Sequence, residues 1–379
     1  MANNNENKIL NVPHLRFPEF SGEWVTKSIN DLAVVIGGGT PDTTVKSYWD
    51  GEIQWFTPSE IGKNKYVDSS LRTITEVGLN NSSAKLLPPN TILLSSRATI
   101  GECSLSLREC ATNQGFQCLV SKKCNVDFLY YLIQTKKKDL IRKSCGSTFL
   151  EISANEVRKI QVSVPSDVEQ QKIAELLSLI DERIATQNKI IEKLQSLIKG
   201  IAQHCIKEST SGNTYVKLGD ICQITTGKLD ANAQVDNGIY PFFTCAEQPF
   251  KIDSFAFDTE ALLISGNGAN LGYINYYHGK FNAYQRTYVL DIFSENIQYI
   301  KWALKVLLPK RIAIEKSSSN TPYIVLSTLS DLRLPIPNKS IQCHIAKLMQ
   351  SLERKLSSQI ALNGSYNRLK QYLLRQMFI

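Results

Sequence analysis

Side chains that form strong hydrogen bonds gather on turn-like stretches of this chain, between short strand-like runs. Arginine and lysine bind guanine edges or phosphates, whereas asparagine and glutamine bind adenine edges. A run of cations at Lys136–Lys138, continued by Arg142, would add affinity for a polyanion without sequence preference. For each residue the alternative is a solvated surface side chain. The sequence thus offers DNA-binding candidates in both halves: Lys63, Lys65, Tyr66, Arg97, Asn113, Gln114, Lys143, Lys228, Asn267, Asn270, Tyr284, Gln285, Arg286 and Lys316.

Motifs for catalysis are missing from the sequence. An adenine methyltransferase needs an Asn/Asp-Pro-Pro-Tyr/Phe motif, but the double proline at Pro88-Pro89 is followed by Asn90. The phosphate-loop pattern GxxxxGK[ST] is absent. The glycines of residues 266–272 fit a tight turn better than a dinucleotide motif. Asp42 with Glu52 lacks the lysine that completes a magnesium nuclease signature. We therefore expect no catalytic, cofactor-binding or metal-binding residues.

Composition limits the class of protein. With 379 residues, 42% hydrophobic and 21% charged, the chain predicts two or three globular domains. Its net charge of +8 has the sign expected for a nucleic-acid partner, although such an excess also occurs without function. Nine cysteines without CxxC spacing indicate reduced thiols and a cytoplasmic location. No apolar run approaches the length that a membrane-spanning helix requires, roughly 18 residues, so no membrane span is expected.

Two long helices are predicted, at Gln170–Ile206 and Ile341–Ile379. They would hold the two halves that carry the candidate loops at a fixed distance from each other. Apolar residues in each follow an alternating four-and-three spacing, which is typical of a coiled-coil seam. Each seam position of the first helix has a counterpart in the second helix at a constant separation in the sequence, the separation between Ile173 and Ile345. Each seam carries a glutamine near its middle. The predicted seam residues are Ile173, Leu177, Ile180, Ile184, Gln187, Ile191, Leu194, Ile345, Met349, Leu352, Leu356 and Gln359.

The repeat extends through the rest of the chain. Thr91–Ser95 resembles Ala261–Ser265, and the stretch 143–165 resembles 316–337, each ending at a proline. Strands are expected at Leu32–Ile36, Thr91–Leu94, Gln117–Val120, Ala261–Ile264 and Thr287–Ile292, and helices at Asp127–Lys143 and Asn296–Ile314. We predict an α+β fold with a polar leader (1–16), two globular domains (17–166 and 209–338, the second opening on the flexible turn Ser209–Asn213) and two long helices (167–208 and 339–379).

The path of the chain predicts that the long helices run antiparallel and relate the globular domains by a pseudo-twofold axis. Roughly 35 helical residues span about 50 Å, comparable to the ~34–36 Å between major-groove visits on one DNA face. An antiparallel pair could bring Gln187 and Gln359 together and fix the register. A second apolar face is expected to dock partner proteins or the adjoining domains: Leu176, Ile190, Leu197, Leu348, Leu362 and Leu369.

This layout resembles the specificity subunit of type I restriction–modification systems. Local phrases agree: Pro18–Trp24, Gly37–Pro41 and Trp49–Trp55 resemble the family's entry into its first recognition domain. Glu169–Ala174 resembles the start of its central helix, and Ile341–Ala346 is a looser second version. The resemblance covers the chain from about Phe17 onward.

The resemblance implies a subunit that itself performs no catalysis. Its two target recognition domains would read the halves of a split sequence in double-stranded DNA, and its helices would set the gap between them. Two methyltransferase subunits that modify adenine N6 and one restriction and translocase subunit would be its partners. S-adenosylmethionine, ATP and magnesium would bind those partners. Two alternatives stay open: a coiled-coil scaffold with two divergent protein-binding modules, and a fused methyltransferase or nuclease.

Overall fold

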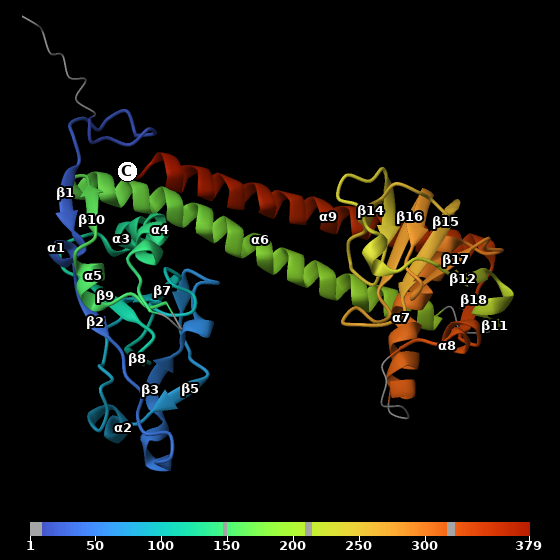
Figure 1. Cartoon of the computed structure of the whole chain (residues 1–379), viewed down its shortest axis with the longest axis horizontal. Helices are drawn as coiled ribbons and strands as arrows, with labels where there is room; N and C mark the ends of the chain where they lie inside the picture. The colour runs from blue at the N-terminus through green and yellow to red at the C-terminus, as the bar shows by residue number, and fades with distance from the viewer. Residues whose placement is uncertain (1–9, 147–149, 209–213, 317–322) are drawn as a thin grey trace, which may run out of the picture. The chain divides into compact units, whose positions relative to one another are not determined.

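The computed structural model of the chain describes residues 10–146, 150–208, 214–316 and 323–379. It divides into two compact units (Figure 1). The first comprises the described residues up to Asn188 together with Leu362–Ile379, and the second comprises those of Lys189–Ala361. The predicted turn at 209–213 lies outside the described residues. Among the described residues, no helix is both long and apolar enough to cross a bilayer.

The described residues of the first unit form three groups of strands. A five-stranded sheet has the order β2-β9-β6-β7-β4, a three-stranded sheet has the order β5-β3-β8, and β1 pairs with β10. The strands are β1 (Val25–Ser28), β2 (Ala33–Gly37), β3 (Trp49–Phe56), β4 (Tyr66–Val67), β5 (Arg72–Ile74), β6 (Ile92–Leu94), β7 (Cys103–Ser106), β8 (Cys110–Thr112), β9 (Gln117–Ser121) and β10 (Gln161–Val164). The helices are α1 (Ile29–Leu32), α2 (Glu76–Asn80), α3 (Val126–Thr135), α4 (Lys137–Arg142) and α5 (Ala154–Arg158).

The second unit repeats this plan around one larger sheet. Its strand order is β12-β17-β15-β16-β13-β14, so the first four strands follow the order of β2-β9-β6-β7. The pair β11 and β18 repeats β1 and β10, with the same antiparallel pairing. The elements are β11 (Thr214–Lys217), β12 (Gln223–Thr226), β13 (Tyr240–Phe243), β14 (Phe250–Ile252), β15 (Phe257–Ser265), β16 (Ile274–Ala283), β17 (Thr287–Asp291), β18 (Arg333–Ile336), α7 (Ile297–Lys316) and α8 (Leu326–Ser330).

Two long helices, α6 (Asp167–Glu208) and α9 (Lys339–Gln376), each contribute to both units. Within the first unit they run antiparallel, because Asp181 pairs with Lys370 at 2.7 Å and Asn188 accepts from Asn363 at 2.8 Å. All twelve predicted seam residues are buried or half-buried. Ile173 and Leu177 join the core of the first unit, and Ile345 joins that of the second.

A glutamine fastens the start of each long helix to its globular domain. In the first unit, the Gln170 side chain accepts from the Asn125 backbone N–H at 3.1 Å and donates to the Pro165 carbonyl at 3.0 Å. In the second, Gln342 makes the same contacts with Asn296 and Pro337, at 3.0 and 2.9 Å. The offset between the two glutamines is the one that relates the helix seams, which confirms at atomic detail the repeat predicted from the sequence.

Replacing Gln342 with alanine is expected to destabilise the second unit. The side chain is fully buried, so the variant would leave the Asn296 N–H and the Pro337 carbonyl without their partner. Each such loss costs about 1–3 kcal/mol. We expect faster amide hydrogen exchange in the first turns of α7 and α9. The matched variant Gln350→Ala on the same helix, where the glutamine is only half-buried, should exchange like the unmodified chain.

Two expected elements differ in detail. Leu32, expected in a strand, ends α1 because Ser28 and Asp31 cap this short helix reciprocally. The single helix expected at 127–143 is divided into α3 and α4, since the Lys136 backbone (φ −91°, ψ 9°) leaves helical geometry. The leader expected at 1–16 is anchored at its end: Arg16 pairs with buried Glu169 at 2.7 Å, and the Leu15 N–H donates to the Gln376 carbonyl.

Candidate nucleic-acid interface

The candidate loops of the first unit share one frame of backbone hydrogen bonds. The Ser96 N–H donates to the Gly115 carbonyl at 2.8 Å, and the Ile152 N–H donates to the Ser96 carbonyl at 3.1 Å. The Asn113 N–H donates to the Phe56 carbonyl at 3.1 Å. Segments that are remote in sequence therefore meet at one end of the strands β3, β6 and β8.

The second unit builds the same frame from equivalent residues. The Gly266 N–H donates to the Arg286 carbonyl at 2.8 Å, and the Ile324 N–H donates to the Gly266 carbonyl at 2.8 Å. The Tyr284 N–H donates to the Phe243 carbonyl at 2.9 Å. The two frames agree in backbone contacts while most of their exposed side chains differ.

A glycine closes each frame by letting two backbone segments touch. A Cβ atom on Gly38 would lie 2.0 Å from the Asn113 carbonyl oxygen, and one on Gly227 would lie 1.9 Å from that of Ala283. No side chain tolerates a contact this short with a backbone atom. Gly38 lets the loop after β2 approach the reverse turn at 113–115 closely. Gly227 does the same for the loop after β12 and the turn at 284–286.

In the first unit, most of the predicted residues have side-chain partners within the described part of the chain. Lys63 and Gln114 are exposed, and Gln114 accepts from the Thr40 hydroxyl at 2.5 Å. Arg97 is 43% exposed and pairs with Glu151 at 2.7 Å. The Asn113 side chain accepts from the Gly115 N–H and so supports its own turn. Lys143 lies 3.9 Å from Glu156.

Lys65 and Tyr66 are tied to the helices of their own unit. The Lys65 side chain is only 6% exposed, pairs with Asp127 at 2.6 Å and donates to the Ser178 hydroxyl at 2.7 Å. The Tyr66 hydroxyl donates to Asp127, and burial, followed by the charge of Asp127, raises the pKa of Tyr66 to about 12. We assign Lys65 to the internal support of the fold, since its ammonium is already satisfied.

Among the predicted residues of the second unit whose side chains are described, Lys228, Gln285 and Arg286 are exposed. Gln285 and Arg286 line a hollow of about 460 Å³ together with Thr226, Gly266, Tyr288, Tyr323, Ile324, Val325 and Leu326. The Tyr284 side chain is half-buried. The Lys316 side chain lies outside the described part of the chain.

Asn267 and Asn270 meet around Cys245. The Cys245 thiol donates to Asn267 Oδ1 at 3.0 Å, and Asn270 Nδ2 donates to the Cys245 carbonyl at 3.0 Å. Both amides therefore have fixed orientations. Cys245 and Tyr323 were not among the residues selected from the sequence. The offset between the two helix seams relates Tyr323 to Glu151, which was not selected either, so the repeat alone gave no signal for this pair of positions.

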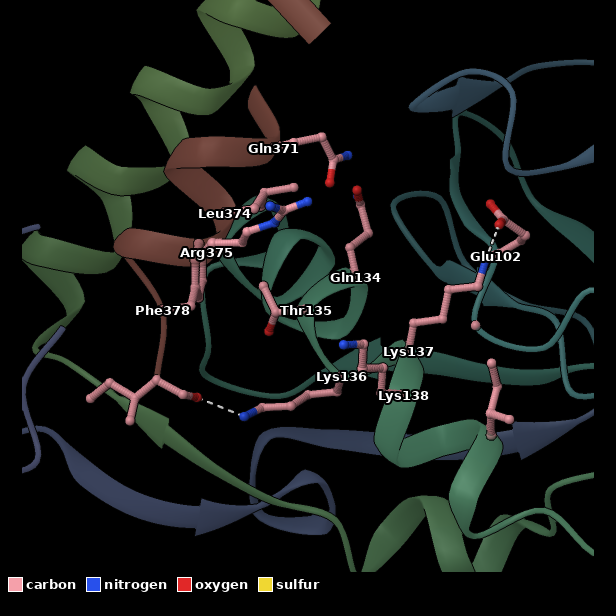
Figure 2. Close-up of a pocket in the computed structure, with 13 residues that line it drawn as sticks. Glu102, Gln134, Thr135, Lys136, Lys137, Lys138, Gln371, Leu374, Arg375 and Phe378 are labelled. Atoms are coloured by element: carbon pink, nitrogen blue, oxygen red, sulfur yellow. Dashed lines mark hydrogen bonds and ion pairs between the residues drawn. The ribbon is translucent and has the colours of Figure 1, made fainter. Parts of the chain in front are cut away.

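The basic run of the first unit borders a hollow of about 1040 Å³ between α4 and the end of α9 (Figure 2). Lys136 donates to the Ile379 carbonyl at 2.6 Å, and burial lowers the pKa of this lysine. Lys137 pairs with Glu102, and Arg142 pairs with Asp139 at 2.8 Å. Internal partners thus reduce the positive charge that this run offers to a polyanion.

The second apolar face of the long helices is largely uncovered. Ile190, Leu197, Leu348, Leu362 and Leu369 are all exposed, whereas Leu176 packs against the core of the first unit. Leu197 also lines a shallow hollow of about 540 Å³ with Lys193, Ser196, Gly200, Ile201 and His204. Contiguous exposed apolar patches are typical of protein-docking sites, whereas single exposed apolar residues are common on any protein surface.

A partly buried ion pair fastens α7 to α9 in the second unit and gives its stability a specific pH dependence. The Lys301 side chain is 9% exposed and pairs with Glu353, which is 31% exposed, at 2.8 Å. Burial lowers the pKa of Lys301, while the hydrogen bond and charge of Glu353 oppose this shift and the charge of Lys305 adds to it.

Replacing Glu353 with glutamine is expected to destabilise the second unit at neutral pH. The cost should be less than the ~3–5 kcal/mol of a fully buried pair, because Glu353 is partly solvated. The variant lowers the pKa of Lys301 in the folded state further below its value in the unfolded chain. Between these two pKa values the unfolded chain binds more protons than the folded chain. The free energy of unfolding of the variant therefore rises with pH, up to about pH 10.4. Urea unfolding should show a smaller deficit at pH 9.5 than at pH 7. The double variant Lys301→Met/Glu353→Leu should lack this pH dependence. If Glu353→Gln lowers the free energy of unfolding equally at both pH values, the explanation is wrong.

Comparison with known proteins gives a consistent result. The model of the type I restriction modification DNA specificity domain matches twice, at residues 21–196 and 210–363. The chain is 30% identical to the type I restriction enzyme MjaIX specificity subunit of Methanocaldococcus jannaschii, over 88% of each chain. It is 42% identical over 143 residues to the EcoDI specificity subunit of Escherichia coli, covering 38% of this chain and 32% of that one.

A solved structure shares the fold. The type I restriction–modification S subunit from M. genitalium superposes with a TM-score of 0.64 at 19% identity, covering 97% of this chain and 99% of the other. The duplicated frame, the paired long helices and the two matches to the domain model have one explanation. The chain belongs to the family of type I restriction–modification DNA specificity proteins.

Proposed function

We propose that this chain is the sequence-specific DNA-binding subunit of a type I restriction–modification complex and reads a split target. One observation carries the proposal: the same loop frame occurs twice and displays different side chains. The first frame displays Arg97 and Gln114, and the second displays Asn267, Gln285 and Arg286. Because the backbone frames agree, the two domains would approach DNA alike and read different bases.

The long helices would dock the catalytic partners. Leu197 and Leu369 are exposed and occupy equivalent positions in the two copies of the repeat, which therefore offers two equivalent apolar sites. Two equivalent sites suit two copies of an adenine-N6 methyltransferase subunit, and a restriction and translocase subunit would complete the complex. S-adenosylmethionine, ATP and magnesium would bind those partners. The chain itself would position DNA without performing a chemical step.

The test is to co-express the chain with its neighbouring methyltransferase subunit and to sequence the host DNA by a single-molecule method that detects N6-methyladenine. We expect a split motif methylated on both strands, and none without this chain. If both proteins are soluble and co-purify but no motif appears, the proposal fails. A coiled-coil scaffold that binds proteins through its two modules would then be the better explanation.

A further inference from the structure

Each loop frame contains a pair of facing residues at the same place, and the residue types in the two pairs differ. The backbone of Arg97 forms an isolated antiparallel β-bridge with that of Glu151 in the first unit. Asn267 and Tyr323 form the same kind of β-bridge in the second unit. Each bridge lies beside the equivalent backbone bonds made by Ser96 and Gly266. The frame therefore presents Arg97 and Asn267 at corresponding positions.

The backbone turns sharply just after each of these two residues. Ala98 has φ +55° and Gly268 has φ +78°, both in the left-handed region. That conformation costs an alanine roughly 1 kcal/mol compared with a glycine. Nothing lies within 4 Å of a Cβ atom built on Gly268, so its backbone conformation, and not a steric contact with a described residue, favours glycine there. Ala98 and Gly268 are exposed, and the residues before them, Arg97 and Asn267, are half-buried.

Each presented side chain is held by a polar partner. One guanidinium nitrogen of Arg97, Nη2, contacts Glu151 at 2.7 Å, and a guanidinium carries five N–H donors, more than this one contact requires. In the second unit, Asn267 Oδ1 accepts from the Cys245 thiol at 3.0 Å, which fixes the orientation of the amide. A side chain held in place before binding loses less entropy on contact with a ligand.

We propose that Arg97 and Asn267 are the equivalent base-edge readers of the two half-sites, with Arg97 reading a guanine and Asn267 reading an adenine. This inference rests on the proposed function. A guanidinium fork donates to guanine O6 and N7, and an asparagine amide donates to adenine N7 while accepting from N6. The Nδ2 of Asn267, which has no hydrogen-bond acceptor among the described residues, and the second lone pair of its Oδ1 match the adenine pattern.

In this proposal Glu151 positions the guanidinium of Arg97. Replacing Glu151 therefore distinguishes a base-reading Arg97 from an ion pair that only stabilises the fold. If this frame faces DNA as proposed, the Glu151 carboxylate lies near phosphates. Removing its charge would then lower electrostatic repulsion and also free Arg97 to move. Glu151→Gln should therefore bind DNA of arbitrary sequence more tightly, while the preference for guanine at one position falls about tenfold. A pair that only supports the fold would show a lower melting temperature and an unchanged preference.

The test is the methylation pattern of cells that express the methyltransferase subunit with the unmodified chain, with Arg97→Gln or with Asn267→Ser. If the unmodified chain gives no split motif, the proposed function fails. Given a motif, Arg97→Gln should relax one G·C position in one half-site, and Asn267→Ser should relax one A·T position in the other half-site, each by about tenfold or more.

Two controls keep the result interpretable. Arg108 pairs with Asp68 at 2.6 Å in the same unit, with both side chains exposed, so Arg108→Gln removes a similar ion pair elsewhere on the surface. It should leave the motif unchanged. Arg97→Lys preserves the charge but not the fork, and should also relax the position. An unchanged motif in Arg97→Gln, or a uniform loss of methylation in both Arg97→Gln and Arg97→Lys, would overturn the assignment.

Discussion

The variant Gly227→Ala is expected to lose the second loop frame and with it all methylation of the split target. The new Cβ atom would lie 1.9 Å from the Ala283 carbonyl oxygen and 2.2 Å from its carbon. These are backbone atoms, so a rotamer change cannot relieve the overlap. The loop after β12 must separate from the turn at 284–286, at a cost of about 3 kcal/mol or more. Amide hydrogen exchange should show the loss in β12 and β17.

The matched control is another glycine, Gly364 in α9. A Cβ atom there would approach only the Arg368 side chain, at 3.5 Å, and alanine favours the helix by about 1 kcal/mol. Gly364→Ala should therefore melt at the same temperature as the unmodified chain or higher. Native-like exchange in Gly227→Ala would contradict the view that close backbone contact defines the frame.

Leu197→Glu is expected to remove one docked methyltransferase subunit from the assembled complex. Leu197 is 54% exposed on α6, so a charge there does not disturb a core but must be desolvated when a partner covers it. The purified complex should contain one methyltransferase copy per chain in place of two. Methylation of the split motif should fall about tenfold or more, because a charge left unpaired in an apolar contact costs more than about 1.4 kcal/mol.

A neighbouring substitution tests whether the charge alone is responsible. Gln195 is exposed two residues earlier on the same helix and points away from Leu197. Gln195→Glu should keep both methyltransferase copies and full methylation. If Leu197→Glu also keeps them, the second apolar face is not the docking site.

Much of the fold follows from the sequence because the chain repeats itself. One constant offset relates Gln170 to Gln342 and Ile173 to Ile345, and in each pair both copies occupy the same place. The four-and-three spacing predicts the long helices because one period fits one buried face. The break between α3 and α4 is less visible, since Lys136 is an ordinary helix former and only its backbone angles reveal the break.

The candidate site is only partly readable from the sequence. A lysine in a loop has the same appearance whether it is exposed to solvent, as Lys63 is, or satisfied internally, as Lys65 is. The partners of Lys65 come from α3 and α6, and Ser178 is 113 residues away. Long-range pairing of this kind leaves no local pattern. Glu151 was missed for a different reason: an acidic residue is not an obvious DNA-binding candidate until its ion pair with Arg97 is seen.

The most direct test of the central claim is the affinity of the complex of this chain with its methyltransferase partner for three duplexes. One duplex carries the complete split motif, and each of the others has one half-site scrambled. If each domain reads one half, each scrambled half should raise Kd about 100-fold or more, since every mismatched base pair costs about 1–3 kcal/mol. The logarithm of the affinity should also fall linearly with the logarithm of the salt concentration. Equal Kd values for the three duplexes would contradict the account.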